Sequence, residues 1–170
     1  MALPDLDSLL RAARRAPVWR SGPDTRALDL HGDAIFALLP HRAPFLFVER
    51  VWAADATQRA IAATRRIDPA DPVFAGHFPG NPVYPGVLLV ETMAQVASCI
   101  EPVLRPGEPT PARFATVRAV FLAPVLPGDG LEIRARAIGE YDGLYSRAIG
   151  QVLRGDTVCA AAVLEAIHVG

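Results

Sequence analysis

The sequence contains no lysine, and all 17 of its basic side chains are arginine. Catalysis through a lysine Schiff base is therefore excluded. The formal net charge is only -1, which argues against a protein that holds nucleic acid by bulk electrostatic attraction. Hydrophobic residues make up 51% of the chain and charged residues 21%, as in a globular protein rather than a largely disordered one.

Cysteine and metal-ligand patterns are equally sparse. Cys99 and Cys159 both have apolar neighbours and no redox or metal spacing, so we expect reduced, buried thiols. No two of the four histidines have metal-ligand spacing, which predicts that no metal is bound. The serine elbow G-x-S-x-G, the P-loop and the dinucleotide fingerprint are absent, which argues against the enzyme classes that depend on them.

Long apolar runs are also missing. No run reaches membrane-spanning length, and the first residues carry Asp5 and Asp7 instead of a long apolar core of the secretory type. We therefore expect a soluble, cytoplasmic protein with no membrane association. At 170 residues the chain is most simply one domain, long enough to bury a core.

The first half of the chain predicts helices and strands around a proline-rich zone. Residues 4–15 and 33–39 suit short helices, and 45–53 and 58–67 suit strands. Residues 68–85 contain five prolines, too many for regular structure. Residues 86–104 are the one candidate for a long helix.

The second half has the character of a β-sheet. Residues 112–122 and 131–138 are expected strands, the latter because apolar and charged residues alternate cleanly. Asp142-Gly143 and Gly155-Asp156 are typical hairpin turns. These patterns predict an α+β fold, in which an antiparallel sheet of about six strands packs one face on the long helix. We divide the chain into an N-terminal extension, residues 1–29, and a main domain, residues 30–170.

The long helix carries one polar stripe. Glu91, Gln95 and Ser98 are spaced at i, i+4 and i+7 in an otherwise apolar segment, so they share one face. On spacing alone, this stripe is either the solvent-facing side of the helix or part of a functional site.

The start of this helix is a candidate binding site for negative charge. Pro85 suits the first turn, and the N–H groups of Gly86, Val87 and Leu88 are then expected to point outward unpaired. Gly86 also permits another group to approach this end closely.

His77 is the other candidate functional residue. Gly76 and Pro79 bracket it, which suggests a fixed imidazole, and such a histidine is either structural or a base. His41 has a comparable setting in LPHRAPF, and spacing alone does not rank the two.

Three segments together resemble one known family. The sequences LLPHRAPFLFVERV (38–51), GHFPGNPVYPGVLLVETMAQ (76–95) and FLAPVLPGD (121–129) look like successive motifs of bacterial 3-hydroxyacyl-[acyl-carrier-protein] dehydratases, in the same order and with similar spacing. The resemblance covers about residues 30–167. It implies a hot-dog fold, in which the antiparallel sheet wraps the long central helix.

The resemblance also implies a site, a carrier and an assembly. His77 matches the family's catalytic histidine and Glu91 its catalytic carboxylate, which come from opposite protomers of a homodimer, often within a trimer of dimers. The donor to the thioester carbonyl maps to Gly86, with Val87 beside it. An acyl carrier protein presents the substrate on its phosphopantetheine arm, so no other cofactor is expected. We expect the acyl tunnel to be lined by Phe45, Phe74, Phe78, Tyr84, Gln95 and Phe121.

Elementary chemistry agrees with this assignment. Eliminating water from a 3-hydroxyacyl thioester removes a proton from C2 while the C3 hydroxyl departs. The developing enolate oxygen needs fixed positive dipoles, which a helix N-terminus offers. The leaving hydroxyl needs a proton, so an acid must stand near a base. His77 is our candidate for the base, and His77 or Glu91 delivers the proton to the hydroxyl.

Departures from the family pattern concern the substrate. Ala43 stands where an aromatic residue is common, Tyr84 replaces a usual methionine, and Thr92 replaces a usual alanine. They favour a specialised pathway, such as polyketide or polyene assembly, over housekeeping fatty-acid synthesis. Two alternatives stay open: a hot-dog acyl thioesterase, and a non-catalytic, carrier-binding protomer of a heterodimer.

Overall fold

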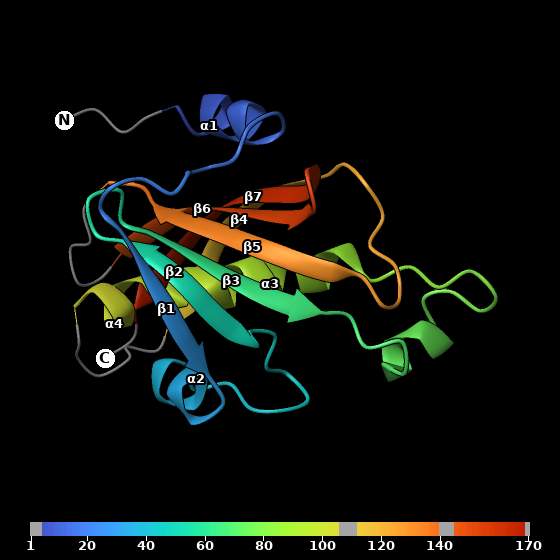
Figure 1. Cartoon of the computed structure of the whole chain (residues 1–170). Coiled ribbons are helices and arrows are strands. Elements are labelled where there is room, and N and C mark those ends of the chain that lie inside the picture. The colour runs from blue at the N-terminus through green and yellow to red at the C-terminus, as the bar shows by residue number, and fades with distance from the viewer. Residues whose placement is uncertain (1–4, 106–111, 140–144, 169–170) are drawn as a thin grey trace.

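The computed structural model describes residues 5–105, 112–139 and 145–168. Its centre is one antiparallel sheet of seven strands in the order β1-β2-β3-β5-β6-β7-β4 (Figure 1). The strands are β1 (Thr25–His31), β2 (Arg50–Asp55), β3 (Ala60–Arg66), β4 (Ala112–Phe121), β5 (Gly130–Ala137), β6 (Tyr145–Arg154) and β7 (Thr157–His168). The helices are α1 (Leu6–Ala13), α2 (Asp33–Leu38), the short 3-10 helix η1 (Pro72–Ala75), α3 (Gly86–Ser98) and α4 (Ile100–Leu104).

The sheet wraps around α3, which confirms the expected hot-dog fold (Figure 1). Leu89, Met93 and Val96 on α3 are fully or almost fully buried in the main core. Gly150 on β6 permits the close approach of the helix, because a Cβ there would lie 2.8 Å from the Met93 Cβ. Apolar side chains along one face of the sheet are thus buried against one helix.

Two expected elements differ in extent. The segment 86–104 forms two helices, because α3 ends at Ser98 and α4 starts at Ile100. The strand expected over 45–53 starts only at Arg50, and residues 45–49 form a connection whose backbone bonds partly to side chains.

The seventh strand, β1, was not expected from the sequence. Its residues TRALDLH are mostly exposed, so the hydrophobic pattern is weak. β1 is held in place by its antiparallel pairing with β2 at the sheet edge, where Thr25 lies opposite Asp55 and His31 opposite Arg50. The hairpin expected at Gly155-Asp156 joins β6 to β7, with Gly155 at a φ of +56°. The turn expected at Asp142-Gly143 lies outside the described residues.

The segment from α1 to Trp19 packs on the outer face of the sheet. α1 lies over β6 and β7, where Leu6, Leu9 and Leu10 contact Ile149 and Val163 (Figure 1). The buried Gln151 side chain donates to the carbonyls of Ala13 and Ala16, and the Trp19 indole donates to the Ile61 carbonyl. The boundary that we drew after residue 29 falls inside β1.

By length and composition, the segment Gly86–Leu104 has the apolar character of a membrane-spanning helix. In this fold that character has another explanation. The segment supplies the core of the sheet, and the side chains of Leu89, Met93 and Val96 are covered by the protein itself.

Candidate active site

His77 is held by its backbone and its ring. Its N–H donates to the Val73 carbonyl at 2.9 Å, and its own carbonyl accepts from the Val83 N–H at 3.0 Å. The ring Nδ1 lies 2.7 Å from the Val83 carbonyl oxygen. Because a carbonyl only accepts, Nδ1 carries the hydrogen, and the neutral ring keeps a lone pair on Nε2. His77 therefore has the tautomer that a general base requires.

The N-terminus of α3 lies beside this histidine. Within the described part of the chain, the N–H groups of Gly86 and Val87 make no hydrogen bond. The Leu88 N–H, also expected to be free, instead donates to the Pro85 carbonyl at 3.0 Å, because the first turn is tight. Two backbone donors are thus available to an acceptor.

His77, Val83, Tyr84, Gly86 and Val87 line a cavity of 460 Å³, which we term the His77 cavity. Phe121 at the end of β4 and residues 122–125 after it also line this cavity. Of the expected tunnel residues, it contains Tyr84 and Phe121. Phe78 is half exposed and stacks on the His77 ring, with 4.0 Å between the centroids. Phe74 packs on Tyr84 at 6.1 Å and is not among the lining residues.

Tyr84 is hydrogen-bonded to a buried arginine, Arg65. Its hydroxyl accepts a hydrogen bond of 2.7 Å from the Arg65 guanidinium, which also stacks on the Phe47 ring at 4.2 Å. Burial raises the pKa of Tyr84 and lowers the pKa of Arg65. The sequence indicated no role for Arg65, since an arginine at the end of a strand is ordinarily a solvated residue.

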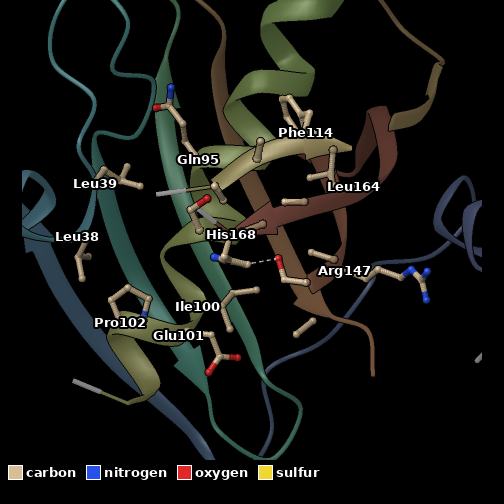
Figure 2. Close-up of a pocket in the computed structure, with 18 of the residues that line it drawn as sticks. Leu38, Leu39, Gln95, Ile100, Glu101, Pro102, Phe114, Arg147, Leu164 and His168 are labelled. Atoms are coloured by element: carbon tan, nitrogen blue, oxygen red, sulfur yellow. Dashed lines mark hydrogen bonds between the residues drawn. The ribbon is translucent and has the colours of Figure 1, made fainter. Parts of the chain in front are cut away.

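Glu91 lies in a second and larger cavity of 710 Å³, the Glu91 cavity. Gln95 and Phe45, both expected tunnel residues, line it too. Figure 2 shows the walls that other elements supply, with Ile100 and Pro102 from α4 on one side and Phe114 and Leu164 from β4 and β7 on another. Most of the wall is apolar, as an acyl chain requires.

Glu91 is oriented by its own helix and by the loop after α2. Its Oε1 accepts a hydrogen bond of 2.9 Å from Gln95 Nε2 and lies 3.6 Å from His41 Nε2. The Gln95 amide, which is buried, also donates to the Phe45 carbonyl and accepts from the Phe47 N–H at 2.8 Å. The polar stripe of α3 is therefore not simply a solvent-facing side.

One chain does not bring His77 and Glu91 together. The two residues line different cavities and share no hydrogen bond or ion pair. The chain thus has two separate candidate half-sites, one with His77 and free backbone N–H groups and one with Glu91 beside an apolar cavity.

No group of three or more His, Cys, Asp or Glu side chains suited to a metal ion occurs within residues 5–105, 112–139 and 145–168.

Comparison with known proteins places the chain in a family. The sequence model of the FabA-like domain matches residues 39–163. A 3-hydroxyacyl-[acyl-carrier-protein] dehydratase FabZ of Polynucleobacter asymbioticus is 38% identical over 144 residues, which cover 84% of this chain and 94% of that protein. The corresponding protein of Bartonella henselae is 37% identical over 147 residues, with the same coverage of both chains.

A solved structure supports the same fold. A chain of the dehydratase heterocomplex ApeI:P from Xenorhabdus doucetiae superposes with a TM-score of 0.68 at 17% identity, covering 85% of this chain and 93% of that one. The chain belongs to the FabA-like domain family, within the group of 3-hydroxyacyl-[acyl-carrier-protein] dehydratases.

Proposed function

We propose that this protein is a hydro-lyase that dehydrates a 3-hydroxyacyl thioester, carried on acyl carrier protein, to the trans-2-enoyl thioester. The observation that carries the proposal is the placement of His77, whose Nε2 is free to accept a proton, in one cavity with the N–H groups of Gly86 and Val87. Base and backbone donors are then on one side of a thioester.

In the proposed reaction, His77 Nε2 removes a proton from C2 of the substrate. The thioester carbonyl becomes an enolate oxygen, and the N–H groups of Gly86 and Val87 stabilise its charge. The C3 hydroxyl departs as water with a proton from Glu91, and the double bond forms between C2 and C3. The proton on His77 returns to Glu91 through solvent, which restores both groups.

We propose that the two half-sites are completed in a homodimer. β4 is an edge strand that pairs on one side with β7, and its residues 112–118 are exposed. Phe114, Val117 and Phe121 on this strand are 47%, 38% and 53% exposed, and Val87 at the start of α3 is 71% exposed. A long apolar edge strand favours pairing with another strand. A second copy on this edge accounts for both the apolar surface and the separated His77 and Glu91.

The substrate arm enters from the surface, and the acyl chain occupies the apolar part of the Glu91 cavity in this proposal. The tunnel then includes Phe45, Gln95, Tyr84 and Phe121, with Phe74 and Phe78 supporting the His77 side. We place the enzyme in the cytoplasm, with polyketide or polyene assembly as its pathway. The departures at Ala43, Tyr84 and Thr92 are the reason for that choice of pathway.

Three outcomes of one assay separate the possible activities. The purified protein is incubated with 3-hydroxyacyl and with enoyl thioesters of pantetheine. Interconversion of the two supports a dehydratase, release of free thiol indicates a thioesterase, and binding without turnover indicates a non-catalytic protomer. The last two outcomes contradict the proposal.

Subunit mixing tests the split site. His77→Ala and Glu91→Ala should each be inactive alone. If the two groups act across the dimer, co-refolding equal amounts restores one intact site per mixed dimer, about a quarter of the wild-type activity. If both groups act within one chain, every site in the mixture lacks one of them, and no activity returns.

A further inference from the structure

His41 stands beside Glu91 without an assigned role. Its Nε2 lies 3.6 Å from Glu91 Oε1, longer than a hydrogen bond but within ion-pair distance. Catalytic hydrogen bonds are often long in ligand-free enzymes and shorten when substrate binds. We infer that His41 is a positioning residue, which holds Glu91 Oε1 through its Nε2–H and leaves Oε2 for the departing hydroxyl. This inference rests on the proposed role of Glu91.

The loop around His41 is tied down on both sides. Leu39 is buried and donates its N–H to the Ile35 carbonyl at the end of α2. The Arg42 guanidinium donates to the carbonyls of Leu39 and His41 at 2.8 and 2.7 Å. Further along, the Phe47 N–H donates to Gln95, one turn from Glu91 on α3. The imidazole is therefore presented to the carboxylate by a backbone that is bonded before and after it.

The surroundings of the ring select its tautomer. His41 Nδ1 is buried and has no hydrogen-bond partner within the described residues. A hydrogen on Nδ1 would leave a buried donor unpaired and would turn the Nε2 lone pair towards the carboxylate. A hydrogen on Nε2 points at Glu91 Oε1. The tautomer with Nε2–H is therefore the one that this environment favours.

Other charged groups do not supply the same contact. The remaining charged or titratable side chains that line the Glu91 cavity are Arg59, Glu101, Arg105, Arg113, Arg147 and His168. Arg59 pairs with Glu101, and Arg147 pairs with Glu165. Of the charged and titratable side chains within the described residues, His41 is the one within ion-pair distance of Glu91.

Three substitutions of His41 distinguish a hydrogen-bond donor at the position of Nε2 from a side chain that only fills space. In His41→Gln the amide nitrogen reaches about the place of Nε2, whereas in His41→Asn it reaches only the level of Nδ1. We expect His41→Ala and His41→Asn to lower kcat about 10- to 100-fold. Their KM should change less than about threefold, because the lost contact acts on the acid and not on the bound thioester. His41→Gln should stay within about threefold of wild-type kcat.

His31→Ala is the matched control, because His31 is exposed at the end of β1. Wild-type kcat in His41→Ala overturns the inference, and so does a His41→Gln variant as slow as His41→Ala. If His41→Ala does not fold, the kcat values of His41→Gln and His41→Asn are compared, and equal values overturn the inference. Glu91→Gln is measured alongside. An active Glu91→Gln enzyme contradicts the proposed role of Glu91 as the acid, on which this inference rests, whereas an inactive one with normal His41 variants contradicts only the role of His41.

Discussion

The backbone of Gly86 lies so close to the Phe121 ring that a Cβ at position 86 would be 2.7 Å from Phe121 Cε1. The start of α3, which offers the free N–H groups, is thus in contact with the end of β4. The sequence indicated that Gly86 permits a close approach, and in the structure the Phe121 ring is the group that lies there. The contact joins the backbone donors to the apolar edge that we assign to the dimer.

Gly86→Ala should therefore displace the Phe121 ring into the His77 cavity. The ring is half exposed and has room to rotate, so we expect a loss of stability of no more than about 1 kcal/mol. The effect on kcat/KM should be larger than the effect on stability, because the displaced ring then competes with the thioester for the cavity. Denaturant unfolding and kcat/KM measure the two effects. In a Phe121→Ala background, Gly86→Ala should cost less stability, and an equal cost in both backgrounds would show that the ring is not the cause.

Gln95→Ala should destabilise the protein by about 2 kcal/mol or more. The substitution leaves the buried Phe47 N–H and the partly buried Phe45 carbonyl without their partner. Urea unfolding is the measurement. Ser98→Ala on the same helix is the control, because Ser98 is exposed and its loss should change stability by about 0.5 kcal/mol at most. Equal effects of the two substitutions would rule out a special role for Gln95.

Tyr84→Phe should cost about 1.5 to 3 kcal/mol of stability. It removes the acceptor for a buried guanidinium whose Nη1 already has no hydrogen-bond partner within the described residues. The cost should shrink to about 0.5 kcal/mol in an Arg65→Met background, where no charge is left unpaired. Thermal or urea unfolding of the four proteins measures this coupling. A cost that does not depend on Arg65 would argue against the pair.

Asp55 should make stability depend on pH. Its buried carboxylate accepts from the Gln58 N–H at 2.8 Å, and from the Gln58 amide and the Thr25 hydroxyl, both at 2.9 Å. The Gln58 backbone hydrogen bond is the main cause of a pKa below the usual 3.8. Stabilisation by the ionised form is complete above about pH 5 and is lost as the pH falls through the lowered pKa.

Asp55→Asn tests this pH dependence. The difference in unfolding free energy between wild type and variant should be constant above about pH 5 and shrink progressively below about pH 4. Asp29→Asn is the control, because Asp29 makes an exposed pair with Arg50 and should contribute about 0–1 kcal/mol. A difference that stays constant down to pH 2.5, roughly the lower limit of such titrations, would contradict the assignment.

Much of the fold followed from local patterns. The alternation over 131–138 predicted β5, and the Gly155-Asp156 pair predicted the turn between β6 and β7. The weakly apolar β1 escaped prediction, because its order depends on pairing with β2 and on the hydrogen bond between Thr25 and Asp55. A strand whose side chains stay mostly exposed leaves little periodic signal.

The candidate site residues also fall into those named from the sequence and those recognised only in the structure. His77, Glu91 and Gly86 were named from their motif, because each carries its chemistry in its residue type and in the adjacent loop or helix. Arg65 and His41 gained their importance only through contacts with Tyr84 and Glu91, which lie 19 and 50 residues further along the chain. Spacing did not distinguish His41 from His77, because the partner of His41 lies 50 residues away and leaves no mark on the local sequence.

By itself, the sequence determined the fold class, the helix that forms the core and the residue types able to move a proton. Periodicity and motif spacing act over a few residues and are readable without coordinates. Only the tertiary structure decided that His77 and Glu91 occupy separate cavities, that Phe121 packs against Gly86, and that His41 lies beside Glu91. These relationships depend on how distant segments pack around α3, and packing is a property of the whole chain.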